Sequence, residues 1–141
     1  MYLKLILIAA FAIACAKESD NDPKTPAQLL TQRPWKLVSH GFDNNSNNKI
    51  DPDEEAIEDC EKDNSYNFYV NGTGLVEENL LKCTNGISEF SFNWRFADGQ
   101  KTLDVFFAAL HILKMDEEQM ILAGDENANG QIPRHIGIYR H

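Results

Sequence analysis

Hydrophobic and polar residues alternate with a period of two along most of the chain after residue 34. The clearest stretch is residues 89–97, in which every second position carries a large aromatic side chain: Phe90, Phe92, Trp94 and Phe96. Successive side chains of a β-strand point to opposite faces, whereas a helix repeats every ~3.6 residues. The pattern therefore predicts strands rather than helices.

Eight such segments follow one another, with turn residues between nearly all of them: residues 35–42, 65–71, 74–82, 89–97, 101–110, 111–115, 119–124 and 134–141. Nothing between them resembles the long crossover helix that parallel neighbours need, so we expect an antiparallel sheet. Eight strands in simple succession predict an all-β fold, an eight-stranded antiparallel up-and-down barrel, which also removes exposed sheet edges.

A short helix is expected ahead of the first strand, because Thr25 is a favourable N-cap residue and Pro26 suits the first helical position. Within the first strand, strict alternation assigns the side chains to two faces, one with Trp35, Leu37 and Ser39 and the other with Lys36, Val38 and His40. In the segment 101–110, the side chains expected to point inward are those of Leu103, Val105 and Phe107.

The first 15 residues contain an early cation, Lys4, then an apolar run of ten residues that ends directly before Cys15. Ten apolar residues suit a signal-peptide core and are too few to span a bilayer. The segment resembles the signal peptide of bacterial lipoproteins, in which the cysteine after a small-residue box is lipidated and becomes the mature N-terminus. An ordinary secretory signal with an incidental cysteine is the alternative.

The resemblance implies that residues 1–14 are removed, that Cys15 carries the lipid and that residues 15–24 form a flexible tether. Residues 25–141 are then the barrel domain. The location expected for such a protein is the cell envelope, as an outer-membrane lipoprotein that is periplasmic or surface-exposed. Acidic residues soon after the cysteine resemble the export tag of surface-displayed lipoproteins: Glu18, Asp20 and Asp22.

The chain is acidic, with 13 Lys and Arg residues, 22 Asp and Glu residues and a formal net charge of −9. Removing residues 1–14 takes away one cation, so the mature balance is 12 − 22 = −10. Phosphate backbones repel such a protein, which argues against a nucleic-acid partner. Anionic lipid repels it too, so we expect membrane attachment to depend on acyl chains.

Cys60 and Cys83 are the two cysteines left once Cys15 is assigned to the N-terminal segment. The residues between them predict a hairpin with a two-residue turn at Asn71 and Gly72, which would place the two cysteines roughly opposite each other. An even pair in an exported protein predicts a disulfide. Two buried free thiols are the alternative.

The sequence DNNSNNKIDPDE, residues 43–54, has oxygen-bearing side chains at nearly alternate positions, in the order of an EF-hand-type calcium loop. The expected ligands are five side chains and one backbone carbonyl, that of Lys49, in the set Asp43, Asn45, Asn47, Lys49, Asp51 and Glu54. Asn48 stands where such loops need a positive φ, a conformation that asparagine tolerates.

With three carboxylates in the set, we expect an affinity of roughly 10⁻⁴–10⁻³ M and a structural role for the Ca²⁺. A solvated Asn-rich loop without an ion is the alternative. Residues 125–132 repeat only the first half of the pattern and are expected to form a hairpin loop.

Over residues 25–141 the order of features resembles the lipocalin-like domains of bacterial lipoproteins. The matching parts are the short helix, the first strand with RPWKLVS, the acidic loop ending in DCEKDNSYNFYVNGTG, a second cysteine after the hairpin, and the last strand with IGIYR. In lipocalins a first-strand Trp stacks beside an Arg of the last strand and closes one end of the barrel. The resemblance implies this structural cation–π pair for Trp35 and Arg140.

The sequence holds no arrangement typical of an enzyme, since its four histidines are scattered and it has no Gly-rich phosphate loop, G-x-S-x-G or C-x-x-C motif. We therefore expect a non-catalytic binding module. The aromatic face is the candidate lining of a pocket for a small apolar ligand: Phe90, Phe92, Trp94 and Phe96. If these rings fill the barrel instead, a surface or periplasmic protein-interaction module is the alternative.

Overall fold

Residues 22–83, 88–106, 108–125 and 133–141 are described in the computed structural model. The expected signal segment, Cys15 and residues 16–21 of the tether lie outside these ranges, as do Phe107 and residues 126–132 of the second Asn-containing loop.

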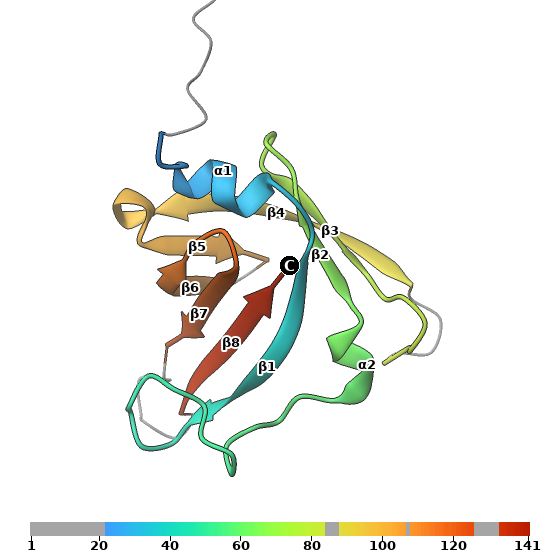
Figure 1. The fold of residues 1–141 in the computed structure, drawn as a ribbon, viewed down its shortest axis with the longest axis vertical. Coiled ribbons are helices and arrows are strands. Elements are labelled where there is room, and N and C mark those ends of the chain that lie inside the picture. The colour runs from blue at the N-terminus through green and yellow to red at the C-terminus, as the bar shows by residue number, and fades with distance from the viewer. Residues whose placement is uncertain (1–21, 84–87, 107, 126–132) are drawn as a thin grey trace, which may run out of the picture.

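Eight antiparallel strands close into a barrel in which each strand pairs with its neighbours in the sequence and the last pairs with the first (Figure 1). Their bounds are β1 Trp35–Asp43, β2 Ser65–Phe68, β3 Thr73–Glu77, β4 Glu89–Ala97, β5 Thr102–Val105, β6 Ala108–Met115, β7 Gln119–Gly124 and β8 Arg134–Arg140. The predicted all-β, eight-stranded up-and-down barrel is confirmed, and it is consistent with a calycin-like fold.

Among the described residues, three short helical segments accompany the strands: α1 Pro26–Thr31, α2 Asp59–Lys62 and the 3₁₀ segment η1 Asp98–Gln100. The predicted helix start is confirmed, because Thr25 and Gln28 form a reciprocal capping box in which each side chain accepts a backbone N–H of the other residue. Helix α1 lies across one end of the barrel (Figure 1), and the buried Trp35 donates its Nε1–H to the carbonyl of Leu30 at 3.0 Å.

The barrel core beneath α1 is filled with side chains from that helix, from strands β1 to β5 and from β7: Leu30, Trp35, Phe68, Val76, Phe92, Leu103, Val105, Met120 and Leu122. Aromatic rings stack edge to face, with centroids 5.3 Å apart for Phe68 and Phe92 and 5.6 Å apart for Trp94 and Phe96. The shared face predicted for β4 is confirmed for Phe92, Trp94 and Phe96, which pack in or against this core. Phe90 is 44% exposed at the start of the strand.

The predicted two-residue turn at the β2–β3 hairpin is wrong. Tyr69 N–H donates to the carbonyl of Thr73 at 2.8 Å, so the loop has three residues, and Gly72 takes the positive φ of 82° that such loops place on glycine. Ser65 consequently lies opposite Glu77 instead of residue 78. The pairing register is therefore shifted by one residue from the expected one.

The segment 101–110 is not one strand, because the chain turns directly after Val105, which lies opposite Ala108. The predicted inward positions of Leu103 and Val105 are confirmed by their burial. Phe106 has φ of 54°, a conformation uncommon for a bulky residue and tolerated here at a hairpin turn.

A β-bulge in β1 contradicts the predicted alternation of that strand. Leu37 lies opposite Tyr139 and Ser39 lies opposite Ile138, so Val38 is the extra residue. Beyond the bulge, His40 lies opposite Gly137 and Phe42 lies opposite His135. Since residues directly opposite share a face of the sheet, His40 and Phe42 lie on the inner face with Leu37, and the prediction that put His40 on the other face is wrong.

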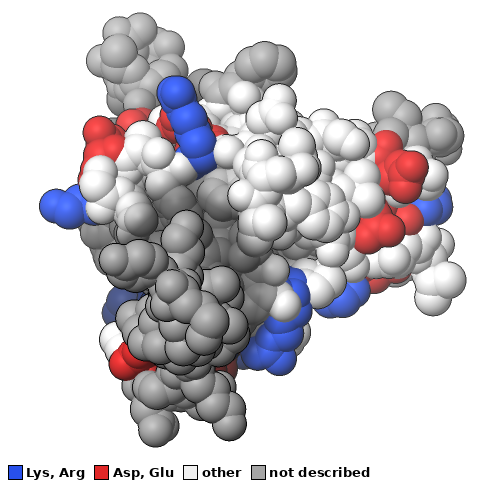
Figure 2. All heavy atoms as spheres, turned by 90° about the horizontal axis from the view of Figure 1, so that it is seen from above, with Lys and Arg blue, Asp and Glu red and all other residues white. Residues whose placement is uncertain are grey.

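Seen from above, over the end that carries α1, charged side chains of both signs lie mainly around the margin of a continuous uncharged area (Figure 2). On the part of this face that belongs to the described residues, Lys and Arg side chains are dispersed and do not form one basic patch.

Candidate functional site

The Asn-rich loop leaves β1 at Asp43, whose side chain is 1% exposed. One carboxylate oxygen of Asp43 accepts the N–H of Asn47 at 2.9 Å and the other accepts the N–H of Asn48 at 2.8 Å. Asn48 has φ of 60°, as predicted for its position. The first half of the loop is therefore wound around the Asp43 carboxylate.

Glu54 closes the loop from its other end and is 7% exposed. Its two carboxylate oxygens accept the N–H of Asn44 at 2.7 Å and the N–H of Asp51 at 3.0 Å. Two buried carboxylates, one from each end of the loop, thus organise its backbone.

The asparagine side chains lie between these two carboxylates. Asn45 Oδ1 accepts the N–H of Asn47 at 3.1 Å, and Asn47 Oδ1 accepts the N–H of Lys49 at 2.8 Å. Both side-chain NH₂ groups donate to Oδ2 of Asp51, at 2.8 Å from Asn45 and 3.0 Å from Asn47. Asp51 is therefore the point on which the two amides converge.

The loop folds back over the outer face of β1. A Cβ atom built on Gly41 would lie 2.1 Å from the carbonyl oxygen of Glu54 and 3.0 Å from Cγ2 of Ile50, so this position has room only for glycine. The return is fixed by backbone hydrogen bonds, from Phe42 N–H to Glu54 and from Ala56 N–H to His40.

The loop is rich in the oxygen-bearing groups that a hard divalent cation prefers. Asp43 and Glu54 are buried, the ion pairs found among the described residues do not include them, and calcium favours carboxylate, amide and carbonyl oxygens. Within the described ranges, however, no group of three or more His, Cys, Asp or Glu side chains is close enough to hold one metal ion. Backbone N–H groups and asparagine NH₂ groups occupy the carboxylate oxygens in this arrangement.

The pair predicted between Trp35 and Arg140 takes a different form. The ring stacked on Trp35 is that of His141, with centroids 3.7 Å apart, while Arg140 is exposed and lies opposite Lys36 on β1. His141 is held in place by the carbonyl of Pro34, 2.9 Å from its Nδ1. The closing partner of Trp35 is therefore one residue beyond the expected position.

The predicted disulfide between Cys60 and Cys83 is confirmed, with Cα atoms 5.3 Å apart. Cys60 lies in α2, and Cys83 follows β3. The two cysteines therefore meet beside the hairpin, and they do not lie opposite each other across its strands as predicted.

An open pocket of about 450 Å³ lies where β4 runs past the β5–β6 turn, and it is lined by Asn93, Trp94, Arg95, Asp104, Phe106, Ala108 and Ala109. The ring of Phe106 packs against Phe92 and Phe90, with centroids 4.7 and 5.4 Å apart. Arg95 and Asp104 form an ion pair of 2.7 Å beside these apolar side chains. Of the four predicted lining residues, Trp94 contributes directly to this pocket.

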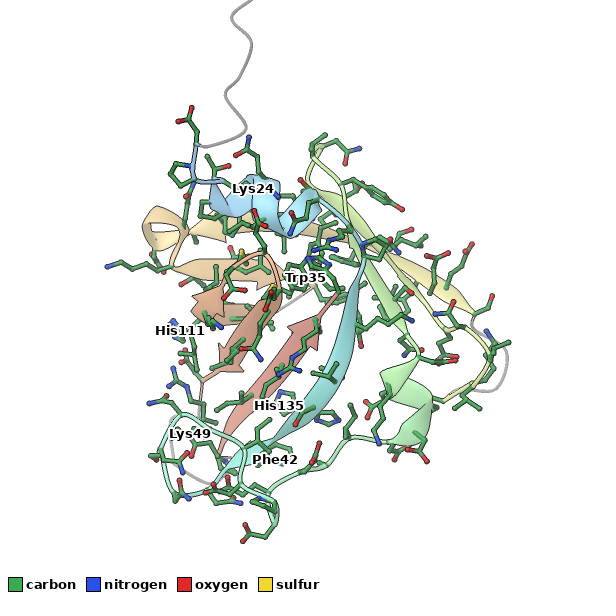
Figure 3. All side chains as sticks on the ribbon, in the orientation of Figure 1. Lys24, Trp35, Phe42, Lys49, His111 and His135 are labelled. Carbon is green, nitrogen blue, oxygen red and sulfur yellow. A yellow bond between two sulfur atoms is a disulfide. The ribbon has the colours of Figure 1, made fainter. Side chains whose placement is uncertain are left out.

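A second group, missed from the sequence, lies on the inner face near the opposite end of the barrel from α1. Figure 3 shows Phe42 and His135 close to the end of β1 and β8 that joins the Asn-rich loop, with Trp35 at the other end. His40 Nδ1 is 3.0 Å from His135 Nε2, and His40 Nε2 is 2.9 Å from Glu61 Oε2.

Electrostatics couples the members of this group. Burial acts to raise the pKa of Glu61, but the N–H of Glu58 and the His40 imidazole outweigh it and hold that pKa below its ordinary value. Burial and the neighbouring His40 lower the pKa of His135. Burial raises the pKa of Tyr139, with smaller contributions from neighbouring acidic groups. The imidazole of His135 is therefore favoured in its neutral form.

Only the bulge at Val38 brings His40 to the inner face, and no residue type in the sequence marks that bulge. The spacing of His40, Glu61 and His135 along the chain also carries no motif, because each comes from a different element: β1, α2 and β8.

None of the helices in the described residues has the length and apolar character needed to cross a membrane. No model of a known protein family matches the chain, and no curated protein matches it either.

Proposed function

We propose that this protein is a lipid-anchored, extracytoplasmic lipocalin-like module that binds a small apolar ligand without catalysing a reaction, and that Ca²⁺ orders its Asn-rich loop. The observation that carries the ligand-binding part is the pocket of about 450 Å³ beside Trp94 and Phe106. Pockets of a few hundred Å³ lined by aromatic side chains and a few polar groups are typical ligand sites.

The lining of this pocket differs from the predicted one, because Trp94 borders it and Phe90, Phe92 and Phe96 do not. The core rings beneath α1 pack against each other, as the alternative of a filled barrel expects, so the proposed ligand site is the open pocket at the flank, between β4 and the β5–β6 turn. Other open pockets of similar volume lie among the described residues, and this one is chosen for its aromatic lining. Phe106, 48% exposed, contributes an apolar surface there, and Arg95 with Asp104 can orient a polar group of the ligand.

The backbone of Phe106 supports this assignment. A phenylalanine at φ of 54° carries a conformational penalty of about 1–3 kcal/mol, and such strain gathers at binding sites. That conformation places the Phe106 ring against Phe90 and Phe92, where it forms one wall of the pocket.

The calcium part rests on the two buried carboxylates at the ends of the loop and on the positive φ of Asn48. The residues that would hold the ion are Asp43, Asn45, Asn47, Lys49, Asp51 and Glu54. Arg134 lies opposite Asp43 and donates to the side chain of Asn48, but Asp43 and Glu54 form no ion pair among the described residues, so calcium would add positive charge between them. Its role is to fix the loop against Gly41.

The lipid anchor at Cys15 and a place in the cell envelope rest on the N-terminal pattern alone, with the confirmed disulfide as support, since disulfides persist in oxidising compartments. Radioactive palmitate labelling of the full chain in a Gram-negative host tests the anchor. Label incorporation is expected in the wild type and not in Cys15→Ser.

A protein-interaction module is the second candidate. Phe90 and Phe106 are 44% and 48% exposed and in ring contact, so the same flank offers an apolar surface to a protein partner. The choice between the two depends on whether the flank accepts a small molecule.

The test uses the full chain in detergent-free buffer after cleavage of any lipid, with the fluorescent apolar probe 1-anilinonaphthalene-8-sulfonate. Phe106→Ala removes the pocket wall and is expected to weaken probe binding at least tenfold, whereas Val70→Ala, at an exposed hairpin tip, is the matched control. Equal probe affinity in Phe106→Ala and wild type, with circular dichroism unchanged, would contradict the proposed ligand site. Native mass spectrometry with and without chelator would then report bound calcium and any co-purified ligand separately.

A further inference from the structure

Two imidazole nitrogens face each other inside the barrel end opposite α1. His40 Nδ1 and His135 Nε2 are 3.0 Å apart, and the ring centroids are 5.1 Å apart. Two nitrogens on one zinc ion, with bonds of about 2.0–2.1 Å and angles between about 90° and 110°, are separated by about 2.9–3.3 Å. A separation of 3.0 Å is that of a hydrogen bond between the two rings, and it also falls within the range for neighbouring ligands of one metal ion.

The third member of the group defines the tautomer of His40. Its Nε2 lies 2.9 Å from Glu61 Oε2, and a carboxylate can only accept a hydrogen bond, so Nε2 carries the proton. In the neutral ring the lone pair of Nδ1 is directed at His135, whose Nε2–H it accepts until a metal ion takes the place of that proton. Metal-binding histidines commonly donate their other ring N–H to a carboxylate in this way, which fixes the ring and raises its basicity.

Glu61 is itself held firmly. Its Oε2 also accepts the N–H of Glu58 at 2.8 Å, and the neighbouring Cys60 is tied to Cys83. The position of the His40 ring is thus determined by a side chain on a short helix that the disulfide links to the connection between β3 and β4. The negative charge of Glu61 lies beside Nε2 of His40 and favours a cation at Nδ1, on the other side of the ring.

We infer that His40 Nδ1 and His135 Nε2 together bind one divalent transition-metal ion, such as Zn²⁺, Cu²⁺ or Ni²⁺, with Glu61 as the positioning residue for His40. Imidazole nitrogens prefer these ions, and among them Cu²⁺ binds most tightly. The described residues bring no third His, Cys, Asp or Glu side chain into the ligand set. The remaining coordination positions therefore belong to water or to a small exogenous ligand entering past Phe42, which lies beside His135 with ring centroids 5.4 Å apart.

This ion differs in kind from the Ca²⁺ of the Asn-rich loop, because one site is built from nitrogens and the other from oxygens. Asp43 lies on the outer face of β1, whereas His40 lies on the inner face, so the two sites are separated by the sheet. The inference does not depend on the proposed function.

The test is a titration of the full chain, purified in detergent and stripped with chelator, then kept in millimolar Ca²⁺ so that oxygen sites are saturated. Isothermal calorimetry with Zn²⁺ is expected to give one site per chain, weakened at least tenfold in His40→Asn and in His135→Asn. Glu61→Gln is expected to weaken it by about 10–100-fold, as for other residues that orient a ligand. His111→Asn is the matched control, because His111 also pairs with an acid, Asp125, but lies on β6 away from the group (Figure 3).

Two readouts keep the test independent of how well the variants fold. Electron paramagnetic resonance of the Cu²⁺-loaded wild type is expected to show coordination by two imidazole nitrogens. Nitrogen NMR of the wild-type histidine rings is expected to show Zn²⁺ shifting the signals of His40 and His135 while those of His111 and His141 stay in place. Zn²⁺ affinity unchanged in the His40→Asn/His135→Asn double variant, or ring signals indifferent to Zn²⁺, would overturn the inference and leave the two histidines as a hydrogen-bonded pair.

Discussion

Removing the disulfide gives a prediction whose size follows from the structure. The bond closes a loop with a sequence separation of 23, and the chain-entropy relation assigns such a closure about 3.4 kcal/mol at ~25 °C. In the folded state the same region is held without the bond, because Asp63 Oδ2 accepts the N–H groups of Leu80 and Leu81 at 2.8 and 3.0 Å. The double variant Cys60→Ser/Cys83→Ser should therefore keep its fold and lose stability through the unfolded state.

Urea denaturation followed by tryptophan fluorescence measures this effect. We expect the free energy of unfolding to fall by about 3 kcal/mol and the m-value to rise, because the unfolded chain becomes less compact. Asp63→Ala is the comparison, since it removes folded-state hydrogen bonds and should lower the midpoint with the m-value unchanged. A loss below about 1 kcal/mol in the double variant, or an unchanged m-value, would refute the reasoning that the bond acts on the unfolded chain.

Three further predictions concern β1, its loop and the chain end. Gly41→Ala should lower the free energy of unfolding by about 2–4 kcal/mol, and the melting temperature with it, because its Cβ would lie 2.1 Å from a backbone oxygen. In the control Gly124→Ala the new Cβ meets nothing nearer than 3.7 Å, so the free energy of unfolding should change by less than about 1 kcal/mol. Calcium at about 100 times its dissociation constant should stabilise the wild type by about 2.7 kcal/mol in thermal melts. Glu54→Gln should abolish this stabilisation by calcium, and the control Asp53→Asn, at an exposed position, should retain it. Burial lowers the pKa of His141 below its ordinary value of about 6.5. The neutral ring therefore stabilises the fold above pH ~6.5, and this stabilisation is lost as the pH falls through the lowered pKa. In His141→Gln the melting temperature should fall less steeply as the solution is acidified.

The barrel was predictable because its strands carry the period-two signal strongly and its turns are short. The aromatic stretch of β4 is the best example, since four rings at alternate positions leave no helical alternative. The errors concern single residues: one extra residue in the β2–β3 loop, a turn at Phe106 without glycine, and the bulge at Val38. Each depends on pairing with a distant strand or on a backbone conformation that side-chain type does not specify.

The candidate sites divide in the same way. The Asn-rich loop is local in sequence, so its pattern could be recognised, and the positive φ of Asn48 agrees with it. The disulfide needed only a count of cysteines and a compartment. To predict the pocket beside Trp94, one must know that β4 lies against the β5–β6 turn. To predict the histidine group, one must know that three separate elements meet. A local sequence pattern specifies neither of these contacts.

The bulge at Val38 connects the two polar sites, because β1 carries a residue of each. Without the extra residue, every side chain beyond Leu37 would exchange faces. His40 would then leave the barrel interior, and Asp43 would point into it, away from the loop that winds around its carboxylate. Gly41 would likewise no longer lie where the absence of a Cβ atom lets the backbone of Glu54 pack against β1. One inserted residue thus assigns an imidazole to the inside and a carboxylate to the outside of the same strand, which is why the histidine group and the Asn-rich loop lie close in sequence and are separated by the sheet.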